Sequence, residues 1–261
     1  MKSIDQEINS VKTEILNNFV EVFYNNELKK FITLNSKFIR SKIAILYFKT
    51  LGYEINDQIY KVLAIGEIIH CASLLHDDVL DEAEMRRGQK TLSKEFSSKV
   101  SILAGDYLLT HAIDKIQSLN NAQIMNLFNI CTKNMIKAEI NQYFLRKKIP
   151  DLESYLNVCK GKTADLFSTI LMSCSLILNS NISQAKSFGE KIGLFFQLKN
   201  DIEESSALND MKNDIYTIKD ILGVEKSAIL LDNYKKDIRE FLNNLPDNII
   251  RRELEDLIIC L

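Results

Sequence analysis

The chain has 261 residues, of which 46% are hydrophobic, and its formal net charge is -2 at pH 7. A chain without an excess of basic residues is not typical of nucleic-acid-binding proteins, so any cationic site must be local. Only eight glycines and two prolines are present, which favours long helices over many strands and turns. No linker or low-complexity run interrupts the sequence, and the length suffices for a large core, so we predict a single domain over residues 1–261.

Cysteine usage and the N-terminal residues bear on location. The five cysteines are scattered, odd in number and without a C-x-x-C pair, which predicts reduced, mostly buried thiols. The first residues lack the apolar core and cleavage site of a signal peptide, and we find no uncharged stretch long enough to span a bilayer. We therefore expect a soluble, cytoplasmic protein.

Hydrophobic residues recur at intervals of three and four along most of the chain, the period of an amphipathic helix. Short segments rich in Asn and Gly separate the periodic stretches. We predict an all-α protein with helices over residues 3–24, 37–52, 56–81, 92–96, 99–118, 121–146, 151–178, 182–204, 225–243 and 247–259. The polar segment 205–220 is weakly periodic and is predicted to be a loop or lid near a site.

The helix predicted over 56–81 ends in three carboxylates, Asp77, Asp78 and Asp81, which follow a run of apolar residues. Buried carboxylates without partners are costly, and three together repel one another unless a cation offsets them. Asp77 and Asp81 are four residues apart, so they share one helix face at a separation of roughly 6 Å. Oxygen ligands in this arrangement suit Mg²⁺, which is usually completed by water and substrate phosphates. An exposed acidic helix end is the alternative, and the flanking apolar residues argue against it.

A second polar cluster lies near the end of the helix predicted over 182–204. Asn200 and Glu204 share one face, Asp201 lies beside them, and Gln197 is one turn earlier. Alone, this pattern is typical of an ordinary charged helix end. Together with the first cluster, it predicts two acidic walls that face each other across a helical bundle, where metal sites are often built.

Several basic residues are candidates for binding phosphate, because Arg offers a planar fork of donors and Lys a point charge. Each one taken singly is more often a solvated surface charge. The pair that follows Asp81 is the exception, since it can fold back over the carboxylates. The candidates are Lys37, Arg40, Arg86, Arg87, Lys162 and Lys219. No zinc-binding set, nucleophile triad or Gly-rich phosphate loop is found in the sequence.

In this order the motifs resemble the trans-isoprenyl diphosphate synthases, or polyprenyl synthetases, over roughly residues 30–225. The stretch LLHDDVLDEAEMRRGQKT resembles the first aspartate-rich motif of that family, and GLFFQLKNDIEE stands where the family has G-x-x-F-Q-x-x-D-D-x-x-D. NSKFIRS keeps Lys37 and Arg40 of a G-G-K-x-x-R-P signature. LAGDYLL, AEINQ and GKTADLF also occur in the expected order.

The resemblance implies antiparallel helices around a deep central cavity, usually in a homodimer. It implies up to three Mg²⁺ ions, or Mn²⁺, bound by residues from both acidic clusters: Asp77, Asp78, Asp81, Asn200, Asp201 and Glu204. Arg86, Lys162 and Lys219 would bind the diphosphate of an allylic substrate such as farnesyl diphosphate. Isopentenyl diphosphate would be bound by Lys37, Arg40, His70 and Arg87, and Thr163 and Gln197 would lie over the allylic cation. No protein nucleophile is required.

Product length is expected to depend on the helix that precedes Asp77. Ala72 and Ser73 are small, so neither should block a product that grows along this helix. The first motif also lacks the two extra residues of bacterial farnesyl-type enzymes. We therefore expect about seven to nine isoprene units, about C35–C45, suited to a quinone side chain and delivered to a membrane. A short-chain farnesyl or geranylgeranyl diphosphate synthase is the alternative.

Departures from the family pattern leave two further alternatives open. Asn200 and Glu204 replace aspartates, and Ser41 replaces the proline of the first signature. Because an amide is a neutral ligand, one metal should bind more weakly, and the chain could be a low-activity or regulatory subunit of a heteromeric synthase. A terpene cyclase would require Ser and Glu where Glu204 and Leu208 stand, which argues against cyclisation.

Overall fold

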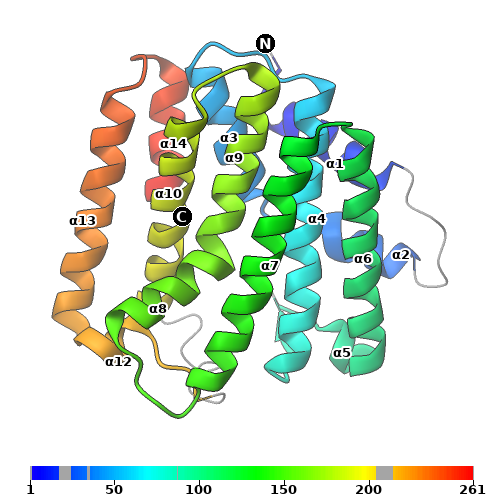
Figure 1. Cartoon of the computed structure of the whole chain (residues 1–261), viewed down its shortest axis with the longest axis vertical. Helices are drawn as coiled ribbons and strands as arrows, with labels where there is room; N and C mark the ends of the chain where they lie inside the picture. Colours follow the sequence, from blue (N-terminus) through cyan, green and yellow to red (C-terminus); the bar gives the residue numbers. More distant parts are fainter. Residues whose placement is uncertain (1, 18–24, 34–35, 87, 204–213, 261) are drawn as a thin grey trace. The chain divides into compact units, whose positions relative to one another are not determined.

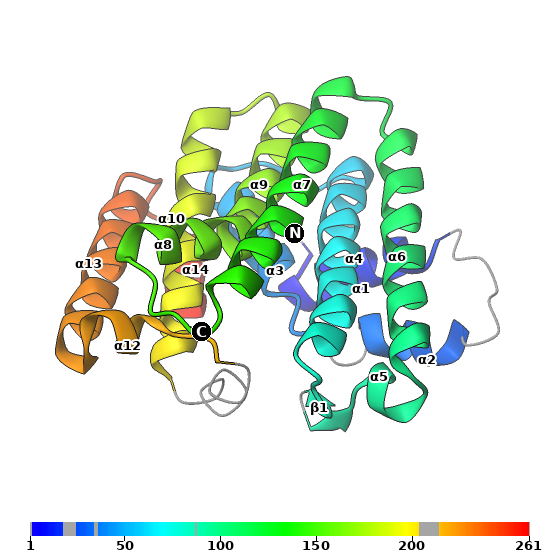
Figure 2. The same ribbon diagram turned by 60° about the horizontal axis from the view of Figure 1, so that its bottom comes forward.

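A computed structural model describes residues 2–17, 25–33, 36–86, 88–203 and 214–260. Within these residues the structure is almost entirely helical, which confirms the predicted all-α fold (Figures 1 and 2). The helices and strands are α1 (Ile4–Leu16), α2 (Asn25–Thr33), α3 (Ile39–Thr50), α4 (Asp57–Leu80), β1 (Met85–Arg86), β2 (Gln89–Lys90), α5 (Leu92–Glu95), α6 (Ser98–Ser118), α7 (Ala122–Leu145), α8 (Leu152–Cys159), the π-helix η1 (Lys160–Ala164), α9 (Asp165–Leu178), α10 (Ile182–Ile202), α12 (Ile218–Leu222), α13 (Val224–Asn243) and α14 (Ile249–Ile259).

The residues group into two compact units. The first comprises Met1–Ile45 and Glu54–Met125, and the second comprises Leu46–Tyr53 and Asn126–Leu261. The single domain predicted from the sequence stays a prediction.

The first unit is organised around α4, which is apolar on almost every side and largely buried. Its start is fixed by Asn56, whose side chain accepts a hydrogen bond from the backbone of Ile59, as an N-cap does. The antiparallel helix α6 lies beside it (Figure 1), and α1 and α2 also pack on it. The approach of α6 is close, since a Cβ at Gly105 would lie 2.3 Å from the His76 ring. Burial of α4 therefore fixes the helix that ends in the three aspartates.

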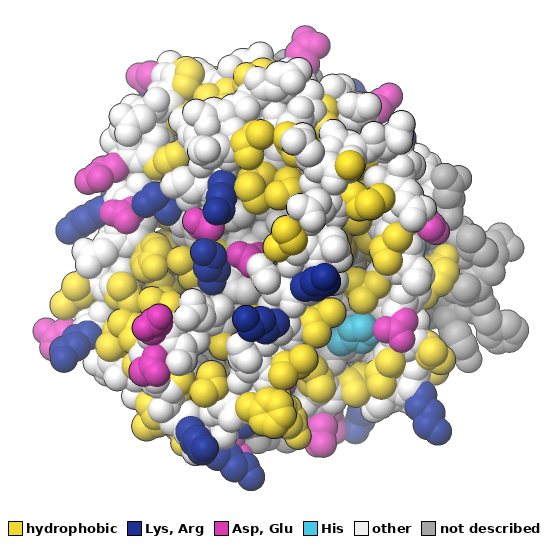
Figure 3. Space-filling view, viewed as in Figure 1, with side chains coloured by type: hydrophobic (Ala, Val, Ile, Leu, Met, Phe, Trp, Pro, Cys, Tyr) yellow, Lys and Arg dark blue, Asp and Glu magenta, His cyan; other side chains and the backbone are white. Residues whose placement is uncertain are grey.

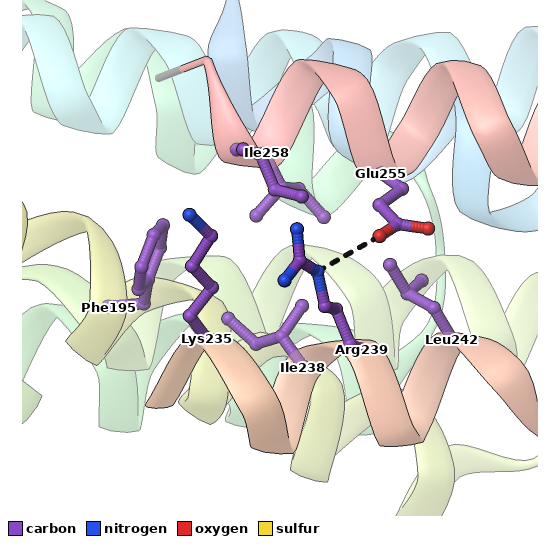
Figure 4. A pocket seen from close by; sticks show the side chains of 8 residues that line it. Phe195, Lys235, Ile238, Arg239, Leu242, Glu255 and Ile258 are labelled. Atoms are coloured by element: carbon purple, nitrogen blue, oxygen red, sulfur yellow. Dashed lines mark hydrogen bonds and ion pairs between the residues drawn. The ribbon is translucent and has the colours of Figure 1, made fainter. Parts of the chain in front are cut away.

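The second unit is built on α9, α10 and α13. Gly193 of α10 lies against the end of the π-helix η1, where a Cβ would come within 2.3 Å of the Ala164 Cα, so only glycine allows this approach. At the C-terminal end, α14 packs on α13 through Ile258, Ile238 and Leu242, beside an ion pair between Arg239 and Glu255 at 3.2 Å (Figure 4). These contacts fix α10, which carries the second polar cluster.

Four elements differ from the prediction. The helix predicted over 3–24 ends at Leu16, and α2 is a separate helix that the periodicity did not reveal. A β-hairpin follows α4, with Met85 paired to Lys90, and its two-residue strands are too short to leave a periodic signal. Part of the predicted loop over 205–220 forms α12, while residues 204–213 lie outside the described residues. The helix predicted over 151–178 is interrupted by the π-helix η1.

Two helical stretches, Asp57–Leu80 and Leu152–Leu178, are long and apolar enough to cross a membrane, so our expectation of no such stretch was wrong. In each, most of the apolar window is buried inside the protein, 72% and 67% respectively. Core helices of soluble proteins have the same character, because their apolar residues face other helices rather than lipid.

The surface carries apolar side chains among charged ones (Figure 3). On α7 four of them are more than half exposed, namely Ile136, Ile140, Tyr143 and Phe144. Their spacing of three and four residues places them along one side of the helix. All five cysteines are free thiols, and four of them are buried, as predicted.

Candidate active site

The predicted site residues divide between the two units. The first unit carries Lys37, Arg40, His70, Ala72, Ser73, Asp77, Asp78, Asp81 and Arg86, and the second carries Lys162, Thr163, Gln197, Asn200, Asp201 and Lys219. Arg87 and Glu204 lie outside the described residues.

Asp77 and Asp81 lie one turn apart at the end of α4, as their spacing predicts. The backbone N–H of Asp81 donates to the carbonyl of Asp77 at 2.9 Å, and both residues are partly exposed. The helix stops here because Glu82 adopts a left-handed conformation, with φ of 47°. Ala83 and Glu82 then donate back to the carbonyls of Asp78 and Val79, which is the Schellman pattern of a helix C-terminus. Asp81 is therefore the C-cap residue, at the end of the helix.

Asp78 has a different environment, because it is fully buried and its Oδ1 accepts a hydrogen bond from the Nε of Arg86 at 2.6 Å. Burial raises the pKa of Asp78, and the Arg86 charge opposes this shift. The ion pair fastens strand β1 to the end of α4, which agrees for Arg86 with the expectation that the arginine pair folds back over the carboxylates, while Arg87 lies outside the described residues. In this arrangement Asp78 holds Arg86, and its part in metal binding stays a prediction.

An Arg side chain has five N–H donors, and Asp78 accepts from the one at Nε. The Arg86 side chain is 29% exposed, so part of it remains accessible. A guanidinium fixed along one edge loses little conformational freedom when it binds a phosphate. The structure therefore favours a preorganised anion site at the end of α4.

The remaining predicted residues of the first unit lie on α3, α4 and the segment before α3. Lys37 is exposed, Arg40 is buried in the first turn of α3 with 7% exposure, and His70 is partly exposed on α4. Ala72 is fully buried, whereas Ser73 is partly buried and its hydroxyl donates to the carbonyl of His70 at 2.8 Å. The position expected to limit product length is thus in the core of this unit.

In the second unit, Lys162 and Thr163 lie in the π-helix η1, a wide turn often found at functional sites. The Lys162 ammonium forms an ion pair with Glu139 at 2.6 Å and donates to the Gln142 side chain at 2.5 Å. Both partners come from α7, in the AEINQ stretch. The ammonium is therefore held in one place while its side chain remains 24% exposed.

Asp201 is the centre of a hydrogen-bonded network. Its Oδ2 accepts from the Tyr155 hydroxyl at 2.5 Å, and its Oδ1 accepts from the Gln197 side-chain amide at 2.8 Å. The oxygen of that amide accepts from the Thr163 hydroxyl at 2.8 Å. The network thus links the predicted residues Thr163, Gln197 and Asp201 and adds Tyr155, which was not predicted.

Burial raises the pKa of Asp201, while the hydrogen bonds from Tyr155 and Gln197 and the charges of Lys162 and Lys219 oppose that shift. Lys219 itself lies on α12 and donates to the carbonyl of Ile202 at 3.2 Å. Asn200, the neutral residue of the cluster, is partly buried on α10. Several cationic and polar groups therefore surround one buried carboxylate.

The donors suit Mg²⁺ in kind, because they are carboxylate and amide oxygens. Asp77 and Asp81 supply two such groups from one turn of the first unit. Among the described residues, no group of three His, Cys, Asp or Glu side chains forms a complete metal site. Mg²⁺ held by one or two carboxylates is usually completed by water and substrate phosphates.

We predict that Tyr155→Phe destabilises the second unit by about 1–3 kcal/mol, since it leaves an oxygen of the buried Asp201 carboxyl group without its hydrogen-bond donor. Urea unfolding followed by circular dichroism measures the change. Tyr234→Phe is the matched control, because Tyr234 packs against the same apolar cluster as Tyr155. Equal stability of Tyr155→Phe and the wild type would show that the Tyr155 hydroxyl does not stabilise Asp201.

Comparison with known proteins shows the family to which the chain belongs. The family model "Polyprenyl synthetase" matches residues 21–255, so the chain belongs to the polyprenyl synthetase family. It is 32% identical to the octaprenyl diphosphate synthase of Escherichia coli (strain K12) over 206 residues, which are 77% of this chain and 62% of that enzyme. The chain thus covers less than two thirds of that relative. The prenyl transferase of Cyanidium caldarium is 28% identical over 98% of this chain and 89% of its own length.

Solved structures support the same fold. The chain superposes on the decaprenyl diphosphate synthase from Rhodobacter capsulatus with a TM-score of 0.87 at 20% identity, covering 98% of this chain and 95% of that one. The heptaprenyl diphosphate synthase from Staphylococcus aureus gives a TM-score of 0.88 at 19% identity, over 99% and 97% of the two chains. The isoprenoid synthase fold expected from the resemblance is therefore confirmed.

Proposed function

We propose that the chain is a trans-prenyltransferase that condenses an allylic diphosphate with isopentenyl diphosphate and repeats the step to make a long polyprenyl diphosphate. The observation that carries the proposal is the end of α4, where Asp77 and Asp81 lie one turn apart beside an arginine fixed by Asp78. Two carboxylates and a fixed guanidinium suit a diphosphate that arrives with its divalent cations. Membership of the polyprenyl synthetase family supports the proposal.

In this reaction the residues of the chain bind and orient the two diphosphates. Arg86, Lys162 and Lys219 bind the allylic diphosphate, and Lys37, Arg40, His70 and Arg87 bind isopentenyl diphosphate. Asp77 and Asp81 would hold Mg²⁺, and Asp201, with Asn200 and Glu204, would hold a further Mg²⁺. When bound, these ions would stabilise the negative charge that develops on the leaving diphosphate. Thr163 orients the Gln197 amide through their hydrogen bond, so that its dipole faces the allylic cation. The released diphosphate accepts the proton that is lost when the new double bond forms.

The direct test uses the purified chain with Mg²⁺, isopentenyl diphosphate and farnesyl diphosphate, and resolves the products by length. A ladder of all-trans products that stops at about seven to nine isoprene units is expected. Absence of product, with activity restored by Asn200→Asp or by a second protein, would favour the regulatory subunit instead. The neutral Asn200 in the acidic cluster is the observation behind that second candidate.

Product length is predicted to depend on Ala72. Larger side chains in a graded series, Ala72→Val, Ala72→Leu and Ala72→Phe, should shorten the product step by step, because each fills more of the space beside α4. Thermal melting of each variant controls for misfolding, since Ala72 is fully buried and overpacking costs about 1–3 kcal/mol. Folded variants that make products of unchanged length would refute the assignment of Ala72.

We also propose that the protein is a homodimer located in the cytoplasm. The exposed apolar side of α7 formed by Ile136, Ile140, Tyr143 and Phe144 supports a dimer, because an exposed apolar patch favours association. The five free cysteines support a reducing compartment. Sedimentation equilibrium should give about twice the chain mass of 30.0 kDa if the patch pairs two copies.

A further inference from the structure

The first turn of α3 is fastened to α4 by a buried carboxylate that the sequence analysis did not single out. Glu67 of α4 is 2% exposed, and Ser41 of α3 is fully buried. The same carboxylate oxygen of Glu67 accepts two hydrogen bonds from Ser41, one from the hydroxyl at 2.7 Å and one from the backbone N–H at 3.2 Å. One residue of α3 thus donates twice to a single group on α4.

This contact supplies hydrogen-bond acceptors to the N-terminal turn of α3. Ser41 is the third residue of α3, and the N–H groups of the first turn have no partner inside their own helix. A carboxylate at this end also interacts favourably with the positive end of the helix dipole. Because both bonds come from one residue, they fix the rotation of α3 as well as its distance from α4.

The backbone before this turn is strained. Phe38 has a φ of 54°, a left-handed conformation that is uncommon and costly for a bulky residue. Its carbonyl accepts from the N–H of Lys42 at 2.8 Å, its ring is buried, and the Lys12 ammonium lies 5.3 Å from the ring centroid. Such a conformation persists only when the surroundings determine it. The anchored turn of α3 is one of these surroundings.

Lys37 and Arg40 lie on either side of Phe38, so their placement depends on this junction. We propose that Glu67, acting through Ser41, is a positioning residue that sets Lys37 and Arg40 for the diphosphate of isopentenyl diphosphate. The inference rests on the proposed function, in which these two residues bind that substrate. The family signature has proline at the position of Ser41, and proline has neither an N–H nor a hydroxyl. The pair of hydrogen bonds from Ser41 to Glu67 is therefore a feature of this chain's own sequence.

The test measures steady-state kinetics with both substrates varied. Ser41→Ala and Glu67→Gln should each raise the KM for isopentenyl diphosphate by about tenfold, the effect of weakening one hydrogen bond to a charged group. The kcat and the KM for the allylic substrate should stay unchanged. Ser41→Thr, which keeps both the hydroxyl and the backbone donor, should have the wild-type KM for isopentenyl diphosphate.

Tyr60→Phe is the matched control for general loss of stability. It also removes a hydroxyl that donates to a buried carboxylate: Tyr60 lies on α4, as Glu67 does, and donates to Glu7 of α1. It should lower the melting temperature as the test variants do and leave the KM for isopentenyl diphosphate unchanged. An equal rise in that KM for Tyr60→Phe would mean that the effect comes from stability, which would overturn the proposal.

Calorimetric titration of isopentenyl diphosphate into the protein separates the two ways to fail. If the wild type binds this compound and Ser41→Ala and Glu67→Gln bind it equally well, the positioning role of Glu67 is refuted and the proposed function stands. If the wild type does not bind it, the proposed function fails and the inference fails with it. Weaker binding by both variants, with normal binding by Ser41→Thr, is the expected result.

Discussion

Replacing Asp81 with asparagine is expected to lower kcat by about a thousandfold, because a carboxylate that binds the catalytic cation contributes several kcal/mol and each 1.36 kcal/mol is a factor of ten. Asparagine is a favourable residue near a helix C-terminus, so α4 should still end at the same place. The Mg²⁺ concentration for half-maximal rate should also rise. Initial rates at varied Mg²⁺ measure both changes.

Glu82→Gln is the control for Asp81→Asn, since it neutralises the adjacent carboxylate, which is exposed. It should leave the rate and the Mg²⁺ dependence unchanged. Removal of the divalent cation with a chelator should stop wild-type turnover, and added Mg²⁺ should restore it. An Asp81→Asn protein that is folded and retains more than about a tenth of wild-type kcat would exclude Asp81 as a required ligand.

The second large effect is expected at Lys162. Lys162→Gln should lower kcat/KM for the allylic diphosphate by about a hundredfold, the loss expected when a charge-assisted hydrogen bond to phosphate disappears. The KM for isopentenyl diphosphate should not change, because other residues are proposed to bind that substrate. Kinetics with each substrate varied at saturating levels of the other separate the two effects.

Lys160→Gln is the matched control, because Lys160 lies in the same π-helix and pairs with Glu190 at 3.2 Å with 48% of its side chain exposed. Exposed ion pairs contribute little, so Lys160→Gln should behave as the wild type. Equal losses in both variants would point to a general effect of charge on this turn. Loss of activity in Lys162→Gln alone would support a specific diphosphate ligand.

The sequence was a good guide to the helices because their apolar periodicity survives in the folded protein. The one-turn relation of Asp77 and Asp81 also followed from spacing alone, since both residues belong to one local element. The left-handed Glu82 that ends α4 could not be foreseen, because Gly or Asn is the usual residue there. The hairpin that brings Arg86 to Asp78 was missed because its two-residue strands are too short to show an alternation of apolar and polar residues.

Contacts between distant segments were beyond the reach of sequence patterns. Tyr155 lies on the apolar side of an amphipathic helix, which predicts core packing, and its partner Asp201 is 46 residues away. The bond between Ser41 and Glu67 spans 26 residues, and the sequence shows only a small polar residue and a single charge on a helix. The available signal was a charged residue within an apolar helix, because such a helix is buried and a buried charge needs a partner. This signal applied to Glu67 as well as to the aspartates.

The π-helix at Lys160–Ala164 has a consequence for how this chain tolerates changes in length. A π-turn holds one more residue than the α-turn it replaces. Deleting a single residue here would close the wide turn into a regular α-turn, and the helices on both sides would keep their relative rotation while the residues of the turn itself shift. Lys162 and Thr163 would then leave their partners on α7 and α10 although every other residue remained. A single-codon deletion in this turn would therefore be as damaging as the loss of both side chains.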